Sequence, residues 1–402
     1  MPPRERKILI SRAISRNGSR FPIWKDSPPT RTFWRRTAIT VHSPENGTWV
    51  IEPQQGFQEW YTIGMGGCCY YHPDMVEHGE ITVHHGEYVT DLITDRALEY
   101  LKELGEGDDP FYLSVHYTAP HSPWEKEHHP AKWIDYYDGC TFPSIPNVPD
   151  HPDLRTGAVY GTGKREENLR GYFAAISAMD EQIGRLLDAV EEQGLADNTV
   201  ILFTADNGMS MGQHGVWGKG NGTFPMNMYD SAVKVPFLIS WPGHIPANTV
   251  CSEMISACDL LPTILELTGL SDRQPTGLPG RSFTELLKGE QREHRDEVVI
   301  FDEYGPVRMI RTKEWKYVHR YPYGKHELYH LVDDPGEEKN LYGLPEYKKL
   351  VTQLKGRMEK WFCTYSDPAI DGVRSAVNGS GQLCRPGVYA IYEDPFAPKG
   401  VE

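Results

Sequence analysis

The sequence predicts an α/β protein whose mostly parallel central sheet is flanked by helices, followed by a small C-terminal α+β subdomain. A continuous apolar, β-branched run over residues 199–205 is typical of a strand buried on both faces. An amphipathic helix over residues 169–193 precedes this run, and the order helix, strand, helix, strand continues around the pair. Such alternation is typical of a sheet built from parallel strands and crossover helices.

The first 50 residues do not fit this pattern. Residues 7–10 could form a short strand, but a basic stretch punctuated by Pro and Gly follows without a sustained period. The first 36 residues carry ten Lys or Arg and only two acidic residues. We therefore expect residues 1–50 to be an atypical basic segment that forms a loop or a disordered arm.

Residues 51–295 carry the signals of the α/β domain. We expect an ordered loop region with aromatic anchors over 55–88, because this stretch is rich in Gly, Tyr and His. A helix is predicted over 90–104 from its apolar spacing. The run 111–117 predicts a strand that ends before Pro120, which cannot donate to a sheet. A Pro-rich loop then continues to about residue 160.

The later elements of this domain have clear boundaries. The apolar stripe of the helix over 169–193 is typical of core packing, and Gly194 is placed to end it. Residues 235–241 predict another strand, and residues 259–268 predict a short helix.

A small C-terminal subdomain is predicted over residues 296–365. Its signals are short antiparallel strands and one amphipathic helix, at 298–301, 307–310, 316–319, 327–331 and 345–362. A Gly- and Pro-rich tail over 366–402 ends the chain.

Composition excludes several classes of protein. The 402-residue chain has a net charge of -15 and a pI of about 5.5, which argues against a nucleic-acid partner. No apolar run reaches the length of a membrane span, and the start lacks the apolar core of a secretory signal, so the compartment is cytoplasmic by default. Seven cysteines without a regular spacing predict buried free thiols rather than disulfides or a zinc site.

Polar side chains follow the ends of the strands predicted over 111–117 and 199–205. Asp206 and Asn207 follow the run 199–205 directly, and a Gly-rich loop with His214 and Lys219 comes next. His121 follows the other strand. Ligands of open α/β sheets bind at the carboxyl ends of strands, so these groups suggest a site for a hard cation and an oxyanion. Asp-Asn-Gly is also a good turn signal, and His121 could be an ordinary loop histidine.

Six segments together resemble the sulfatases of the alkaline phosphatase superfamily, in the family's order. They are Tyr88–Asp95, Ser114–His121, Met179–Leu187, Phe203–Gly208, Gly212–Lys219 and Val235–Gly243. The resemblance extends from about Gly56 to Phe362 and implies an alkaline phosphatase-like fold with a second, smaller subdomain.

The resemblance also implies an activity and roles. The chain would hydrolyse sulfate monoesters, with a small molecule or a carbohydrate as the esterified group. Asp206 and Asn207 would be ligands of a divalent cation, usually Ca²⁺ in this family. His121 and Lys219 would be catalytic residues that face the sulfate, with His121 hydrogen-bonding or protonating the leaving oxygen and Lys219 stabilising negative charge.

The N-terminal segment departs from the family's pattern. The usual nucleophile is a Cys or Ser in a Cys/Ser-x-Pro-x-Arg motif that is oxidised to formylglycine, and acidic metal ligands follow the first strand. Ser27-Pro-Pro-Thr-Arg31 fits the motif alone, without the residues that should follow it, so the nucleophile is unknown. No acidic pair follows residues 7–10, which leaves the cation with few ligands.

Two alternatives to an active sulfatase therefore stay open. One is a catalytically impaired or truncated protein with the sulfatase fold. The other is a phosphonate or phosphodiester hydrolase on the same fold. Asn207 disfavours it, because relatives that act on phosphoryl groups more often have Asp-His at this position. The oligomeric state is not predicted.

Overall fold

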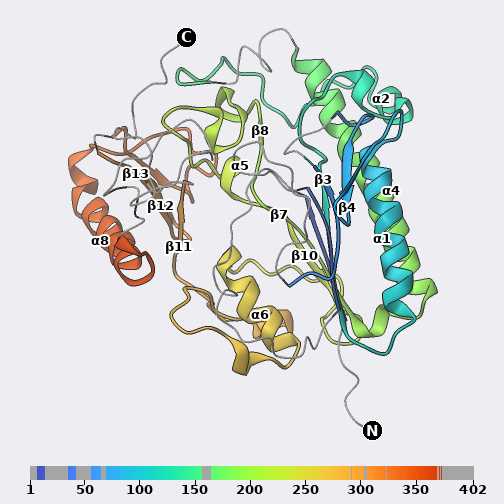
Figure 1. Ribbon diagram of the computed structural model, residues 1–402. Coiled ribbons are helices and arrows are strands. Elements are labelled where there is room, and N and C mark those ends of the chain that lie inside the picture. The colour runs from blue at the N-terminus through green and yellow to red at the C-terminus, as the bar shows by residue number, and fades with distance from the viewer. Residues whose placement is uncertain are drawn as a thin grey trace. The chain divides into compact units, whose positions relative to one another are not determined.

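The chain divides into two compact units in this computed structural model (Figure 1). Unit 1 is Met1–Asn147, Gly157–Met211 and Lys234–Ala247, and unit 2 is Val148–Thr156, Gly212–Val233 and Asn248–Glu402. The described residues are 56–64, 69–155, 164–290, 292–302, 306–322, 324–368, 371 and 373, with the backbone of 7–13 and 35–41. The domain boundaries expected near residues 50, 295 and 365 stay predictions.

Unit 1 contains an eight-stranded sheet in the order β10-β7-β1-β6-β2-β3-β4-β5. Its strands are β1 Lys7–Ala13, β2 Arg35–Val41, β3 Glu59–Ile63, β4 Asp74–Glu77, β5 Glu80–Val83, β6 Phe111–Tyr117, β7 Thr199–Ala205 and β10 Phe237–Ser240. The neighbours from β7 to β3 run parallel, whereas β10, β4 and β5 pair antiparallel. The prediction of an α/β fold with a mostly parallel sheet is confirmed.

Helices α1 Val89–Gly105 and α4 Arg165–Glu192 lie side by side along the sheet of unit 1 (Figure 1). The apolar face of α1, including Ile93 and Leu101, packs in one core with Leu113 and Val115 of β6. Each such buried side chain contributes roughly 1.5–3 kcal/mol of transfer free energy. The remaining short elements of the unit are η3 Lys126–His128, α2 Ala131–Tyr136, η4 Ala196–Asn198 and β8 Ser210–Met211.

Helix α4 begins four residues before its predicted start. Its first turn is polar and contributes nothing to the apolar stripe, but Glu166 and Glu167 suit the positive end of the helix dipole. Gly194 follows the helix with a φ of 66°, so the predicted glycine stop is confirmed.

Two loop predictions in unit 1 are wrong. Strand β1 bears out and extends the short strand considered over residues 7–10. Strand β2 lies where we expected a loop or a disordered arm, because its neighbours β3 and β6 supply backbone partners that local sequence does not reveal. Strands β3, β4 and β5 replace the loop expected over 55–88. Their hairpin turn, His78-Gly79, has positive φ at both residues, a conformation usually signalled by Asn-Gly.

Unit 2 contains a four-stranded antiparallel sheet covered by helix α8 (Figure 1). Its strands are β11 Val298–Phe301, β12 Val307–Arg311, β13 Trp315–Arg320 and β14 Glu327–His330, and α8 is Lys348–Tyr365. Leu354, Met358 and Phe362 of α8 pack on Ile310 and Tyr317 of the sheet. The predicted strands and the helix are thus confirmed to within three residues.

The rest of unit 2 consists of short elements. They are η5 Gln213–Gly215, β9 Trp217–Gly218, η6 Gly220–Gly222, α5 Asp230–Val233, η7 Ala257–Asp259, α6 Leu260–Leu267, η8 Ser271–Arg273, α7 Thr284–Leu287 and η9 Pro345–Tyr347. Across the described part of both units, none of the helices has the length and apolar composition needed to cross a membrane.

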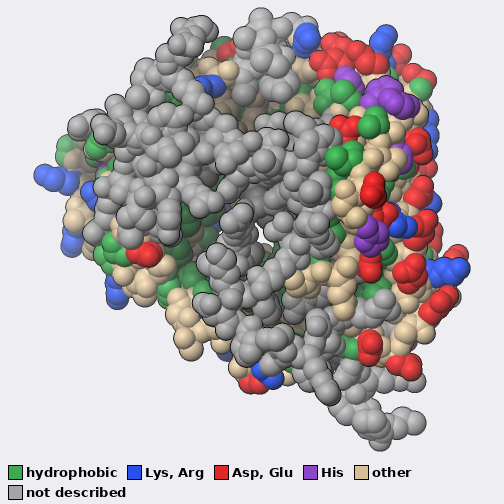
Figure 2. Space-filling model, in the orientation of Figure 1, with side chains coloured by type: hydrophobic (Ala, Val, Ile, Leu, Met, Phe, Trp, Pro, Cys, Tyr) green, Lys and Arg blue, Asp and Glu red, His purple; other side chains and the backbone are tan. Residues whose placement is uncertain are grey.

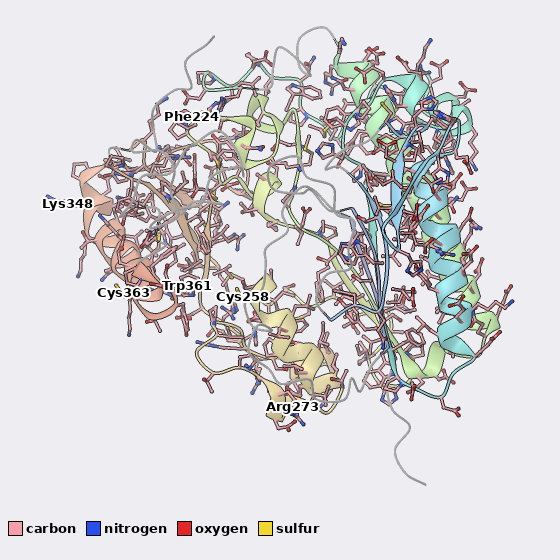
Figure 3. The ribbon with its side chains drawn as sticks, in the orientation of Figure 1. Phe224, Cys258, Arg273, Lys348, Trp361 and Cys363 are labelled. Carbon is pink, nitrogen blue, oxygen red and sulfur yellow. The ribbon has the colours of Figure 1, made fainter. Side chains whose placement is uncertain are left out.

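The described cysteines are free but not buried, which corrects the prediction of buried thiols. Cys140 is half-buried, and Cys69, Cys251, Cys258 and Cys363 are exposed. Figure 3 shows Cys258 next to α6 and Cys363 on α8. Each of the exposed cysteines lies on a loop or on the solvent side of a helix, which composition alone cannot indicate.

The acidic surplus of the sequence is visible on unit 1. Figure 2 shows many acidic side chains along the right-hand side of the view, where α1 and α4 lie in Figure 1. This distribution accords with the net charge of -15.

Candidate functional site

The carboxyl ends of three parallel strands meet at one edge of the sheet in unit 1. Ala13, the last residue of β1, is in register with Tyr117 of β6 on one side and with Ala205 of β7 on the other. Adjacent strands are spaced by about 4.8 Å, so Tyr117 and Ala205 end roughly 10 Å apart. His121 and Asp206 therefore leave the sheet at the same edge, as the sequence predicted.

Asp206 and Asn207 form a local turn and still present oxygen atoms. Asp206 Oδ1 accepts a hydrogen bond from the Asn207 N–H at 2.8 Å, and Asn207 Nδ2 donates to the Gly208 carbonyl at 2.7 Å. Both side chains are half-buried. Because Nδ2 is used by the backbone, Oδ1 is the atom that Asn207 offers to a ligand. The turn interpretation and the ligand interpretation are thus compatible.

The donor chemistry of this pair fits a hard cation, but the pair is small. Ca²⁺ takes about six to eight oxygen ligands, and Asp206 and Asn207 supply one carboxylate and one amide. Within the ranges that the structure describes, no group of three or more His, Cys, Asp or Glu is arranged to hold a metal ion. A cation bound here would therefore need further oxygen ligands besides this pair.

The neutral ring of His121 is held in one tautomer by its own loop. Its Nδ1 lies 2.8 Å from the Ser122 carbonyl oxygen, which can only accept, so Nδ1 carries the proton of the neutral ring. Nε2 is then the atom that can take up or give a proton. The His121 N–H donates to the Thr118 carbonyl at 2.9 Å, which closes the turn after β6.

Thr118 adds a buried hydroxyl to the same loop. Its side chain is 4% exposed, and Oγ1 has no hydrogen-bond partner among the described residues. An unsatisfied buried hydroxyl costs about 1–3 kcal/mol, which a bound polar group could recover. Sequence reasoning missed Thr118 because a threonine at a strand end is an ordinary residue.

Lys219 belongs to unit 2, whereas His121, Asp206 and Asn207 belong to unit 1. Lys219 is half-buried and precedes η6. Its carbonyl accepts from the buried Asn227 side chain, whose Nδ2 lies 3.1 Å away. Asn227 thereby fixes the backbone of the loop that presents the ammonium group.

His214, to which the sequence analysis assigns no role, packs as an aromatic ring. It lies face to face with Tyr229, with ring centroids 3.7 Å apart and planes 7° apart. Burial, together with the nearby His151 and Lys316, lowers the pKa of His214 below its ordinary value. A Cβ on the adjacent Gly215 would clash with the Pro149 carbonyl oxygen, so close packing requires glycine at this position of the loop.

Ser27, which matches the nucleophile pattern alone, lies outside the described residues. The nucleophile therefore stays unassigned. In unit 1 the candidate residues are His121, Thr118, Asp206 and Asn207, and in unit 2 the candidate residue is Lys219.

The chain belongs to the sulfatase family. Residues 31–270 match the family profile described as Sulfatase, and residues 212–363 match the profile described as N-sulphoglucosamine sulphohydrolase, C-terminal. The two matched segments together cover residues 31–363, which include the sheet strands from β2 onward, the C-terminal sheet and most of α8.

Curated relatives include carbohydrate sulfatases. An ulvan-active sulfatase of Formosa agariphila is 29% identical over 86% of this chain and 66% of its own length. An N-acetylglucosamine-6-O-sulfatase of Bacteroides thetaiotaomicron is 28% identical over 80% of this chain and 70% of its own. The chain thus spans about two thirds of the length of these relatives.

A solved structure supports the same family and fold. It is a protein in complex with its substrate D-glucosamine-2-N,6-O-disulfate, with a TM-score of 0.70 and 25% sequence identity. The match covers 84% of this chain and 81% of the other.

Proposed function

We propose that this chain hydrolyses sulfate monoesters of amino sugars, with Ca²⁺ held by Asp206 and Asn207. The observation that carries the proposal is the polar edge of the sheet in unit 1. There, a histidine whose Nδ1 donates to its own loop follows a strand that ends at the same side of the sheet as the strand followed by a carboxylate and an amide. The sulfate ester as substrate follows from membership of the family.

His121 and Lys219 would divide the work on the ester. Cleavage of the S–O bond releases an alcohol, whose oxygen must take up a proton. Protonated His121 can donate from Nε2 while Nδ1 stays bonded to Ser122, so the ring need not reorient. Lys219 would offset negative charge on the sulfate oxygens. A cation held by Asp206 and Asn207 would also offset negative charge there.

The amino-sugar assignment rests on the relatives. One acts on N-acetylglucosamine-6-O-sulfate by its name, and a solved neighbour binds a sulfated glucosamine as its substrate. The match of residues 212–363 to a sulphoglucosamine profile points the same way. We therefore propose the 6-O-sulfate of a glucosamine unit as the bond cleaved.

Release of inorganic sulfate, measured by ion chromatography, tests this function. The full chain, co-expressed with a formylglycine-generating enzyme, is given glucosamine 6-sulfate, N-acetylglucosamine 6-sulfate and 4-nitrophenyl sulfate. A phenyl phosphonate monoester is assayed in parallel by the release of phenol. We expect calcium-dependent sulfate release from the amino sugars and little turnover of the phosphonate. Faster phosphonate turnover would favour a phosphonate hydrolase, and no turnover at all would favour an impaired member of the family.

A further inference from the structure

The loop that carries His121 is held by side chains at four successive carbonyl groups. Trp124 Nε1 donates to the Pro120 carbonyl at 2.9 Å, and Tyr70 Oη donates to the His121 carbonyl at 2.7 Å. His121 Nδ1 donates to the Ser122 carbonyl at 2.8 Å, and His129 Nε2 donates to the Pro123 carbonyl at 2.9 Å. Surface loops ordinarily leave such carbonyls to water, so this segment is fixed to an unusual degree.

Two of these donors come from outside the loop and are fully buried. Tyr70 is 0% exposed and His129 is 2% exposed, and their rings meet edge to face at 4.6 Å. Tyr88 stacks on Tyr70 with centroids 5.4 Å apart, and its hydroxyl lies 3.3 Å from His129 Nδ1. This aromatic cluster of Tyr70, Tyr88 and His129 forms a rigid base under the His121 loop.

The protonation state of His129 follows from its two partners. Pro123 offers a carbonyl that only accepts, so Nε2 carries the proton, and Nδ1 then accepts from the Tyr88 hydroxyl. Burial lowers the pKa of His129 to about 4. The ring is therefore neutral near pH 7, and it acts as a fixed donor that brings no competing charge to the site.

Helix α4 closes the loop from another side. A Cβ on Gly171 would lie 1.8 Å from the Trp124 carbonyl oxygen, so only glycine lets the helix approach the loop this closely. Trp124 is itself buried. The backbone around His121 is thus held by the aromatic cluster and by the α4 surface at Gly171.

We propose that Tyr70 and His129 are positioning residues that fix the tautomer and the direction of the His121 ring. The bond from His121 Nδ1 to Ser122 depends on the orientation of the Ser122 peptide. Tyr70 holds the carbonyl before it and His129 holds the carbonyl after it. Supporting hydrogen bonds of this kind keep a catalytic side chain within the narrow range of useful orientations. The role in turnover rests on the proposed function, whereas the effect on the His121 ring does not.

The test measures the His121 ring directly. The full chain is labelled with ¹⁵N in its histidine rings, and the His121 signals are those lost in His121→Ala. In the wild-type protein we expect a single tautomer with the proton on Nδ1. Tyr70→Phe, which removes one oxygen and keeps the ring, and His129→Leu should each give a mixture of tautomers and shift the His121 pKa by at least half a unit.

Turnover gives the second readout. Tyr70→Phe and His129→Leu should lower kcat at least tenfold with KM changed less than threefold, and His129→Gln, whose amide can donate near the Nε2 position, should recover most of kcat. Tyr136→Phe, an exposed tyrosine on α2, is the matched control.

A purely structural role for the cluster would give a different pattern. If Tyr70→Phe lowers the melting temperature while His121 keeps one tautomer and an unchanged pKa, the positioning proposal is overturned. Tyr70→Phe decides the outcome even if His129→Leu does not fold. An inactive wild-type chain whose variants still change the His121 tautomer would refute the proposed function and leave the positioning role standing.

Discussion

His121→Ala is expected to lower kcat for amino-sugar sulfate esters by at least about 100-fold, the lower end of the contribution of general acid catalysis. Nδ1 of the ring donates to the Ser122 carbonyl, so Nε2 is the nitrogen that would exchange a proton with the leaving oxygen. Alanine removes that group, so the leaving oxygen must depart as an unprotonated alkoxide or take its proton from water. The rate of sulfate release at saturating substrate measures the effect.

Two further variants sharpen this result. His121→Gln keeps a hydrogen-bond donor but cannot transfer a proton, so it should stay within about tenfold of the alanine variant if proton transfer is the main contribution. His244→Ala removes an exposed histidine that stacks on Trp241 in the same unit, and it should leave kcat unchanged. A His121→Ala protein with more than half of the wild-type kcat would show that His121 is an ordinary loop histidine.

Lys316→Met should lower the free energy of unfolding by about 3–5 kcal/mol, the usual effect of breaking a buried ion pair from one side. Lys316 is 0% exposed and pairs with the carboxylates of Asp230 and Glu337, and it donates to the Met228 carbonyl at 3.0 Å. Methionine fills the same volume but leaves Glu337, whose side chain is 2% exposed, without its cation.

The two carboxylates respond differently to this arrangement. Burial raises the pKa of Glu337 despite the nearby ammonium group. Burial also acts to raise the pKa of Asp230, but Lys316 and Arg311 outweigh it and the net pKa is lowered. Loss of Lys316 should therefore drive Glu337 towards its protonated form, and adding Glu337→Gln to Lys316→Met should restore part of the stability.

Urea unfolding followed by tryptophan fluorescence measures the effect of Lys316→Met. The matched control is Lys313→Met, since the Lys313 side chain is 48% exposed and pairs with the half-buried Glu253 and the exposed Glu293. Exposed pairs contribute little, so this control should unfold almost as the wild type does. If Lys316→Met and Lys313→Met unfold at the same urea concentration, the buried network does not hold unit 2 together.

The elements predicted well from sequence are those with one strong local signal. Strands β6 and β7 have the predicted bounds because each is a mainly apolar run followed by a turn or a proline. Strands β2 and β3 were missed because they are partly polar, and their stability comes from neighbours far away in the chain. Local periodicity carries no information about such neighbours.

The candidate site divides in the same way. The position of His121 and Asp206 at one sheet edge could be predicted, because the carboxyl ends of parallel strands meet there. The part played by Tyr70 could not, since its hydroxyl reaches a carbonyl 51 residues further along the chain. His129 likewise looked like one histidine in a Pro-rich loop until its two hydrogen-bond partners were placed.

Calcium titration by isothermal calorimetry most directly tests whether the sheet edge at Asp206 is a functional cation site. The purified full chain should bind Ca²⁺ with a Kd tighter than about 10⁻⁵ M, in the range of protein sites with several oxygen ligands. Asp206→Ala should abolish this binding because it removes the carboxylate of the pair. Absence of binding by the wild-type chain, or equal binding by Asp206→Ala, would contradict the site proposed for this member of the sulfatase family.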